Sequence, residues 1–591
     1  MRRHRALLLA AAVAAAAAAS DAAASSAATT AVAAAVAGAA AAAAAPLQAA
    51  PASPSAAPRP HIVFIFVDDY GYNNIGYHAA SNNASAEILT PRLDELAAAG
   101  VKLERQYVFR FCSPTRSAFH TGRNPIHVNV LNSDLAAANL SDPISGFAGI
   151  PRNMTALPAR LKEAGYRTIA SGKWHVGLAT RDHLPKGRGY DESLVYLDGA
   201  NGYWNDACTG WCSPPSDPYE PTTDLWLNDG PAYGLNASWA CTDKTQGASC
   251  VYEDELLTDF AVNAIDAHDA AQPLFLYFSP HAVHVSASGL VLEVPAAQLA
   301  RFDFMCAGDN SSGCNFRQRY AAITNLVDAY IGRVVDALKA KGMWDNTLLV
   351  LSADNGGLAI ANGFGGGNNF PLRGGKISNL EGGVRVNAFA SGGFIPPARR
   401  GSVEHGFIEV ADWLATFCAL AGVDPHDARA AAAGLPPIDS LDMSALILGA
   451  NATSPREEVV IGADTDDGND GATLVQGVIR ASDGMKLLVG TVQYSGWQGP
   501  LFPNSTTRDG QDASLDCGNV THPLCLFNVL EDPTEHVNLV SSRPDVAAAL
   551  ALRVAALQET VFSPRRGPSL ADFACSHSNA VFGGFVGPFL P

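Results

Sequence analysis

Buried-strand patterns alternate with helical patterns along most of the chain. Continuous apolar runs rich in β-branched and aromatic residues occur in HIVFIFVDD, PLFLYFSPHAVH and NTLLVLSADNGG, and a shorter one occurs in YRTIASGKWH. Between these runs, apolar residues recur at helical spacing in PRLDELAAAG, LPARLKEAG and RYAAITNLVDAYIGRVVDALKAKG. Strands that alternate with helices of this length predict an α/β sandwich. In such folds, functional sites form outside the carboxyl ends of the strands.

The pattern changes at about residue 456. Shorter alternating runs separated by turn residues, VVIGAD, TLVQGVIRASDGMKLLVGTV and LFNVLEDPTEHVNLV, predict a smaller antiparallel sheet with a closing helix near residues 545–558. With 591 residues, 48% of them apolar, the chain can form one large hydrophobic core and a second, smaller one. We therefore expect a large domain over residues 59–455 and a smaller C-terminal domain over residues 456–591, with no membrane span in the mature chain. The irregular stretches 200–250 and 304–315 look like insertions.

The first 58 residues carry no pattern of a folded domain. Residues 1–20 combine a basic start, an apolar run and small residues, which is typical of a secretory signal peptide. An alanine-rich helix or an organelle transit peptide would share that composition. Residues 21–58 are rich in Ala, Ser and Pro and lack large apolar side chains, so they predict a flexible linker.

Sequons and cysteines favour passage through the secretory pathway, to an extracellular or lysosome-like destination. Eight Asn-x-Ser/Thr sequons indicate a glycoprotein, at Asn83, Asn139, Asn153, Asn236, Asn310, Asn451, Asn504 and Asn519. The chain has eleven cysteines, an odd number. In an oxidising compartment ten of them could form disulfides and leave Cys112 out, although parity alone does not identify the odd one. Most of the others lie in closely spaced pairs, whereas Cys112 has no near neighbour in the sequence.

Net charge limits the class of partner. Acidic residues outnumber basic ones by 57 to 39, and the formal charge is −18. Such a charge disfavours nucleic acid or an anionic membrane as the main partner. An anionic substrate must therefore be held by a local cluster of basic side chains.

Two oxygen-rich pairs follow predicted buried strands. Asp68 and Asp69 end the first strand, and Asp354 and Asn355 end a later one. A helix cap and a turn would explain each pair separately. Together they favour a hard cation, Ca²⁺ or Mg²⁺, because these ions take carboxylate and amide oxygens. Cationic and imidazole side chains lie near other strand ends: Arg116, Lys173, His175, His284 and Lys376.

These residues carry a resemblance to the type I sulfatases. The stretch CSPTR, from Cys112 to Arg116, resembles the C-x-P-x-R signature of that family, and GKWH, PLFLYFSPHAVH, GGNNFPLRGGKISNLEGGVR and LFNVLEDPTEHVNL resemble other segments of it, most closely the N-acetylgalactosamine-4-sulfatases of the arylsulfatase B type. The resemblance implies an alkaline-phosphatase-like α/β/α sandwich with a mainly parallel mixed sheet. It also implies that a formylglycine-generating enzyme converts Cys112 to formylglycine during maturation.

The same resemblance assigns roles around the site. It implies that Asp68, Asp69, Asp354 and Asn355 bind Ca²⁺ together with the modified Cys112, and that the substrate is a sulfated carbohydrate. It places the other side chains around the sulfate: Arg116, Lys173, His175, His284 and Lys376. A hydrated aldehyde has two hydroxyls on one carbon, so that one can attack sulfur and the other can expel sulfate afterwards. His284 would then protonate the leaving alcohol, and His175 would support the nucleophile.

The sequence also departs from the family and leaves rivals open. His120 stands where an apolar residue is expected, and because His284 lacks the usual proline after it, His281 is an alternative imidazole. A phosphatase or phosphodiesterase of the same superfamily would use Ser or Thr as nucleophile and two zinc ions. A non-catalytic glycan-binding glycoprotein would keep Cys112 as a thiol. The cysteine and the oxygen-only metal ligands favour the sulfatase.

Overall fold

The computed structural model describes residues 59–131, 135–208, 222–235, 241, 250–287, 291–309, 311–359, 365–465, 473–504, 513–518 and 524–591. The predicted signal peptide and linker lie outside the described residues, as does most of the stretch 209–249. Among the described residues, no helix has the length and apolar character needed to cross a membrane.

A mixed sheet of ten strands forms the centre of the described chain, in the order β13-β2-β12-β11-β1-β10-β4-β5-β8-β9. Its middle strands are parallel, and β12, β8 and β9 bring antiparallel pairing toward the edges. The central strands are β1 (His61–Val67), β4 (Arg167–Lys173), β5 (Glu192–Tyr196), β10 (Leu274–Ser279) and β11 (Thr347–Ala353). The outer strands are β2 (Val101–Leu103), β8 (Trp226–Leu227), β9 (Gly230–Pro231), β12 (Ala388–Ser391) and β13 (Ser402–Glu404). The four strands predicted from apolar runs are therefore confirmed.

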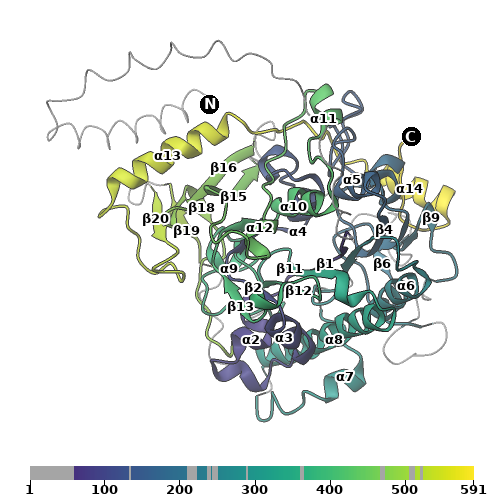
Figure 1. The fold of residues 1–591 in the computed structure, drawn as a ribbon, viewed down its shortest axis with the longest axis horizontal. Coiled ribbons are helices and arrows are strands. Elements are labelled where there is room, and N and C mark those ends of the chain that lie inside the picture. Colours follow the sequence, from purple (N-terminus) through teal and green to yellow (C-terminus); the bar gives the residue numbers. More distant parts are fainter. Residues whose placement is uncertain are drawn as a thin grey trace, which may run out of the picture.

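Two groups of helices lie on opposite sides of this sheet (Figure 1). One group contains α3 (Pro91–Ala98), α6 (Glu253–Ala267), α7 (Ala296–Ala300) and α8 (Ser312–Ala340). The other contains α4 (Cys112–Thr121), α5 (Leu157–Glu163), α10 (Asp412–Ala421) and α12 (Ser444–Ile447). The arrangement confirms the predicted α/β/α sandwich. The shorter helices are α2 (Gly76–Ala79), α9 (Glu381–Val384) and α11 (Ala428–Ala432). Two separate pairs of short strands are β3 (Gln106–Tyr107) with β14 (Ile408–Glu409), and β6 (Ala207–Cys208) with β7 (Thr222–Thr223).

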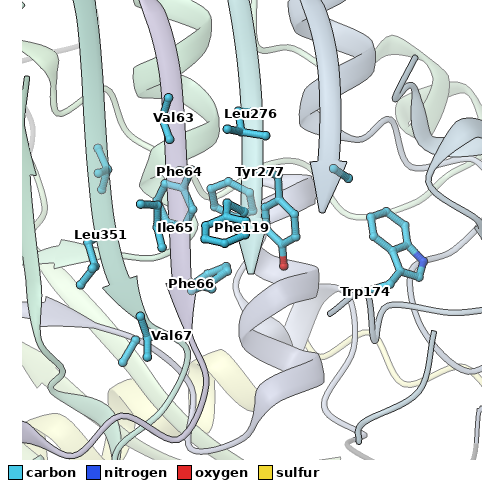
Figure 2. Close-up of a cluster of buried hydrophobic side chains, with 14 of the residues drawn as sticks. Val63, Phe64, Ile65, Phe66, Val67, Phe119, Trp174, Leu276, Tyr277 and Leu351 are labelled. Carbon is cyan, nitrogen blue, oxygen red and sulfur yellow. The ribbon is translucent and has the colours of Figure 1, made fainter. Parts of the chain in front are cut away.

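Aromatic packing fixes α4 on the sheet. Every residue of β1 is buried, and the Phe64 ring of that strand stacks on Phe119 of α4, with ring centroids 4.1 Å apart. Phe66 and Tyr277 contact the same ring edge-on or at a tilt (Figure 2). Such contacts add to the free energy gained by burying the rings. The helix ends at Gly122, whose φ of 64° suits a residue without a side chain. The first turn of α4 is thereby held beside the carboxyl end of β1.

A second, antiparallel sheet follows in the C-terminal part, as predicted. It contains β15 (Glu458–Thr465), β16 (Thr473–Arg480), β17 (Met485–Leu488) and β20 (Cys525–Asn528), with the short pair β18 (Gly490–Val492) and β19 (Leu515–Cys517) beside it. The closing helix α13 (Pro544–Gln558) packs on β16. The chain then returns to the main core, where Phe582 of α14 (Ala571–Phe582) and the following Phe585 are buried. The sequence analysis did not predict α14.

The cysteines correct one expectation. Disulfides join Cys241 to Cys250, Cys306 to Cys314 and Cys517 to Cys525, and Cys575 is disulfide-bonded as well. Within the described residues, however, both Cys112 and Cys418 are free and buried, so pairing of all ten other cysteines is wrong at Cys418. The reason is its position: Cys418 lies on the buried face of α10 and packs in the main core as a small apolar side chain.

Candidate active site

The four predicted oxygen ligands meet at one edge of the main sheet. Asp68 and Asp69 follow β1, and Asp354 and Asn355 follow its parallel neighbour β11, so both pairs emerge at the same end. All four are at most 1% exposed. The Asp69 N–H donates to Asp354 Oδ1 at 3.2 Å, and Asn355 Nδ2 donates to Asp69 Oδ1 at 2.7 Å. Asp69 has a φ of 52°, an uncommon conformation for a residue with a side chain, and such strain often accompanies a functional site.

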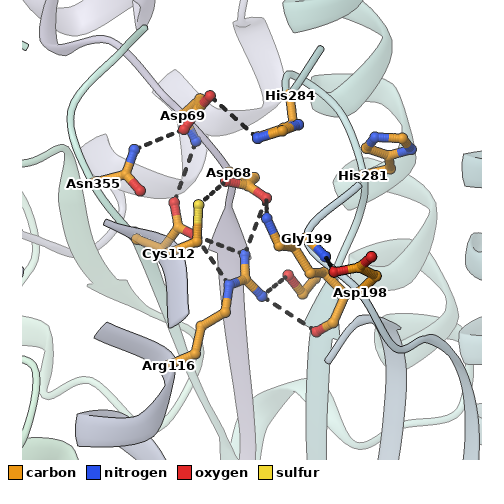
Figure 3. Close-up of polar contacts among 12 residues, drawn as sticks. Asp68, Asp69, Cys112, Arg116, Asp198, Gly199, His281, His284 and Asn355 are labelled. Atoms are coloured by element: carbon orange, nitrogen blue, oxygen red, sulfur yellow. Dashed lines mark hydrogen bonds and ion pairs between the residues drawn. The ribbon is translucent and has the colours of Figure 1, made fainter. Parts of the chain in front are cut away.

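Cys112 begins α4 and faces these acids. Its thiol Sγ lies 3.4 Å from Asp68 Oδ1, to which it donates, and the residue is 1% exposed (Figure 3). Burial and the Asp68 carboxylate raise the pKa of the Cys112 thiol well above its ordinary value. An unmodified Cys112 is therefore a protonated thiol at neutral pH, which makes it a poor nucleophile.

Arg116 lies one helical turn after Cys112, so both side chains project from the same face of α4. Its Nε and Nη2 lie 3.0 and 2.8 Å from Asp354 Oδ2. Its Nη1 donates to Tyr277 Oη at 2.9 Å and to Ser279 Oγ at 2.8 Å, both on β10. The sequence analysis did not identify Tyr277 and Ser279 as hydrogen-bond partners of Arg116. Their i, i+2 spacing on a strand, which places both on one face, was the available signal.

Two lysines and His284 complete the cluster. The Lys173 ammonium at the end of β4 donates to Asp68. Lys376 Nζ lies 2.7 Å from Asp69 Oδ1 and 3.1 Å from His284 Nε2. The His284 imidazole is 3.5 Å from Asp69 Oδ2, and Figure 3 shows it turned toward that carboxylate. The lysine ammonium groups thus face the acids that are predicted to hold a cation.

His175 also lies at this edge, directly after β4. It is 2% exposed, and its Nδ1 has no hydrogen-bond partner among the described residues. A Cβ on Gly199 would lie 3.1 Å from the ring, so a side chain there would press on the imidazole. Burial, followed by the charges of Lys173 and Arg116, lowers the pKa of His175 well below its ordinary value. The imidazole is therefore neutral in this charge distribution.

The other two histidines raised by the sequence lie away from the cluster. His281 Nδ1 is 2.8 Å from Glu253 Oε2, and its ring stacks on Tyr203 at 3.9 Å, so the ring is held in the wall behind His284, while its Nε2 has no hydrogen-bond partner among the described residues. His120 is fully buried in α4, with Nδ1 2.8 Å from the Arg116 carbonyl oxygen, and burial lowers its pKa to about 3. It packs as a neutral polar core residue.

The carboxyl groups carry opposite pKa shifts. Burial tends to raise the pKa of Asp68, but Lys173, His284 and Arg116 outweigh it and hold the pKa well below its ordinary value. For Asp354, burial and the nearby Asp68 charge raise the pKa to about 7 despite Arg116. Burial also raises the pKa of Asp69. Several carboxylates in one buried space need added positive charge to remain ionised together.

The residues present fit a hard cation. One ligand atom each from Asp68, Asp69, Cys112 and His284 lies within 4.8 Å of the others. Asn355 Oδ1 is buried, and in the described part of the chain nothing donates a hydrogen bond to it, as expected of an oxygen aimed at an ion. The carboxylate and amide oxygens match the ligand preference of Ca²⁺ or Mg²⁺.

Comparisons with known proteins bear on the family and the fold. A family model described as Sulfatase matches residues 60–423. Arylsulfatase J of Mus musculus is 31% identical over 88% of this chain and 79% of its own length. N-acetylgalactosamine-6-sulfatase of Canis lupus familiaris is 31% identical over 69% of this chain and 70% of its own length. Among solved structures, Ps i-CgsB has a TM-score of 0.63 at 23% identity, covering 88% of this chain and 98% of that one, which supports the fold.

Proposed function

Because the chain belongs to the sulfatase family, and is thus a sulfuric ester hydrolase, we propose that it hydrolyses sulfate monoesters through a hydrated formylglycine derived from Cys112. The observation that carries the proposal is Cys112 itself, an unpaired thiol buried at the start of α4 and 3.4 Å from Asp68. Pro114 and Arg116 occupy the two signature positions that follow it. As a thiol of raised pKa it has no evident catalytic use, which favours its conversion.

The chain offers a place for both groups that the family implies. Asp68, Asp69, Asp354 and Asn355 would hold Ca²⁺, or Mg²⁺, next to residue 112. The ion would supply positive charge that polarises a hydroxyl and a sulfate oxygen. A hydrated formylglycine would supply two hydroxyls on one carbon, one to attack sulfur and one to release sulfate.

The surrounding side chains would bind and orient the sulfate. The Lys173 ammonium contacts Asp68 and the Lys376 ammonium contacts Asp69, and each can turn from its carboxylate to a sulfate oxygen once a cation offsets that carboxylate. Arg116, held by Tyr277 and Ser279, keeps its charge in a fixed position beneath residue 112. Fixed charges of this kind stabilise the transferring group without reorganisation.

His284 is placed to protonate the leaving alcohol. Its Nε2 is 3.1 Å from Lys376 Nζ, and burial together with that ammonium lowers the pKa of His284 well below its ordinary value. A bound sulfate would bring negative charge next to the ring and raise this pKa, so that the imidazole gains a proton when substrate is present. His175 would orient the nucleophile from the other side.

The substrate class is a sulfated sugar, such as N-acetylgalactosamine 4-sulfate, with aryl sulfates cleaved in vitro. The resemblance in GGNNFPLRGGK supports the 4-sulfate, and relatives named N-acetylgalactosamine-6-sulfatase support the sugar but not the position of its sulfate. Maturation by a formylglycine-generating enzyme in the secretory pathway belongs to the same proposal, and three disulfides in the described chain support that compartment.

A substrate panel tests the proposal. The purified protein should cleave 4-nitrophenyl sulfate and release sulfate from N-acetylgalactosamine 4-sulfate faster than from the 6-sulfate. Efficient cleavage of 4-nitrophenyl phosphate with no action on the sulfate would support the phosphatase rival. Binding of sulfated glycans without turnover would support the non-catalytic rival. A preference for the 6-sulfate would keep the reaction and change the substrate.

A further inference from the structure

The loop that carries Lys376 is held by a later segment of the chain. This loop, residues 368–376, has the sequence NNFPLRGGK, and residues 495–502 lie against it. Asn368 Nδ2 donates to the carbonyl oxygens of Gly499 and Pro500 at 3.0 Å. The Asn369 N–H donates to Gln498 Oε1, and the Gly374 N–H donates to Gly496 O at 2.9 Å. The contacts therefore run along most of the loop.

Arg373 anchors the part of the loop nearest Lys376. Its Nε donates to Ser495 O at 2.7 Å, and its Nη1 donates to Glu535 O at 3.0 Å. Its guanidinium carbon lies 3.9 Å from the centre of the Trp497 ring. Two carbonyl oxygens and a ring fix both the direction and the plane of the guanidinium group.

Glu535, one of the Arg373 acceptors, is itself rigidly held. Its side chain is fully buried, with Oε2 accepting from the Glu381 N–H at 2.7 Å and Oε1 lying 2.8 Å from Lys486 Nζ. Because Lys486 belongs to β17, its ion pair with the Glu535 side chain links the residue whose carbonyl oxygen accepts from Arg373 to the second sheet. The loop is thus tied to a fixed point outside the main sheet.

The loop cannot fix Lys376 by its own stiffness. Gly374 and Gly375 separate Arg373 from Lys376, and Gly374 has a φ of 81°. A side chain on Gly375 would lie 2.7 Å from Gly357 O, so the close approach of the two backbones requires a glycine. Glycine leaves the backbone many conformations. The Lys376 N–H donates to Gly357 O at 3.1 Å, which holds the backbone on one side, so the place of the ammonium, 2.7 Å from Asp69, also depends on what holds the loop on the Arg373 side of the two glycines.

We infer that Arg373 is a positioning residue that fixes the Lys376 ammonium at the sulfate site by tying its loop to Ser495, Trp497 and Glu535. The inference rests on the proposed role of Lys376. It makes the C-terminal part of the chain a component of the active site, although none of the proposed sulfate-binding side chains comes from that part.

A double-mutant cycle separates positioning from general destabilisation. Arg373→Lys keeps the charge but loses the planar fork that reaches two carbonyl oxygens. In the otherwise unchanged protein we expect it to lower kcat/KM for 4-nitrophenyl sulfate by about tenfold or more, because small misplacements of a charged group are costly. In the Lys376→Ala background the same change should lower kcat/KM by less than about twofold, since no ammonium remains to be positioned. Equal factors in both backgrounds, or no effect in either, would overturn the inference.

Two further variants keep every outcome decisive. Gln498→Ala removes a different anchor of the same loop, and if Arg373→Lys does not fold, the cycle with Gln498→Ala decides by the same criterion. Arg553→Ala removes a surface ion pair with Glu458 and should leave kcat/KM unchanged. Full activity of Lys376→Ala would refute the proposed role of Lys376, and the inference would fall with it. If Lys376→Ala lowers activity but the effects of the two substitutions are additive, only the positioning role of Arg373 is refuted.

Discussion

Two clusters of buried charge in this protein have similar composition and opposite organisation. The first, which we call the structural triad, joins Lys486 to Glu381 at 3.0 Å and to Glu535 at 2.8 Å, with all three side chains fully buried. Glu381 also accepts from Tyr107 Oη at 2.7 Å. The second is the candidate active site, where Lys173 and Lys376 pair with Asp68 and Asp69.

The clusters differ in what is left unsatisfied. In the structural triad the Lys486 ammonium contacts both carboxylates, so every charge in the cluster has a partner of opposite sign. At the candidate site, Asn355 Oδ1 and His175 Nδ1 are buried and lack partners among the described residues. Buried polar atoms are nearly always hydrogen-bonded in folded proteins, because leaving them unpaired is costly. The comparison teaches that buried charges paired with one another support packing, whereas buried polar atoms left unpaired beside such charges point to a ligand site.

The largest expected effect separates Cys112 from Cys418, both of which are free buried thiols. Cys112→Ala should lower kcat for an aryl sulfate by on the order of 10⁴-fold or more, as for loss of a covalent nucleophile. Cys418→Ala, on the buried face of α10, should leave kcat unchanged. Steady-state kinetics with equal amounts of folded protein would measure both. Near-normal activity of Cys112→Ala would remove the proposed mechanism.

The next effect concerns the metal. Asp354→Asn should lose the proposed Ca²⁺ or Mg²⁺ and lower kcat by on the order of 10³-fold, because a proposed oxygen ligand of the ion loses its charge. The matched control is Asp328→Asn. Asp328 is also a buried aspartate, but it accepts from the backbone N–H groups of Arg92 and Leu93, so metal content should not change. Elemental analysis would measure the ion, and two zinc ions per chain would favour the phosphatase rival.

The structural triad should show its effect in stability. Lys486→Met leaves two buried carboxylates without their cation, so we expect the free energy of unfolding to fall by about 3–5 kcal/mol. Arg553→Ala breaks an ion pair with Glu458 that is partly exposed on both sides and should cost less than about 1 kcal/mol. Urea unfolding would compare them. An unchanged midpoint for Lys486→Met would show that the triad does not stabilise the fold.

The smallest effect is a pH dependence within the triad. Burial and the Glu381 charge raise the pKa of Glu535 from 4.5 to about 7 despite Lys486, because two carboxylates share one ammonium. The folded state then holds this proton more tightly than the unfolded chain. Its contribution is present below pH 4.5 and is lost as the pH rises through about 7, a change of about 1–3 kcal/mol. Glu535→Gln should flatten this part of the unfolding profile, and an unchanged slope would contradict the assignment.

The sequence predicted the frame of the site well. The apolar run before Asp68 can only be a buried strand, and β11 carries the same pattern before Asp354, so their meeting followed from parallel pairing. Short-range patterns are strong where a strand is buried on both faces. The predicted cations Arg116 and Lys376 lie in the same cluster because α4 begins at that edge and the loop 368–376 ends there.

Other features depend on contacts between distant residues. No local pattern distinguishes His281 from His284, and only the folded chain pairs His281 with Glu253. The attachment of Arg373 to Glu535 spans 162 residues, so neither residue carries a signal for it. From the sequence, Cys418 is expected to form a disulfide like the other cysteines, but in the structure it is buried in α10. Each miss reflects tertiary packing that overrides a local or compositional expectation.

The conversion of Cys112 is the central claim, and mass spectrometry tests it most directly. Protein made in a host with the formylglycine-generating enzyme would be digested with trypsin, and the peptide Phe111–Arg116 would be measured. The account predicts that residue 112 has lost its sulfur and carries an aldehyde, and that the modified fraction rises in proportion to sulfatase activity. Fully active protein with an intact thiol at residue 112 would contradict the account.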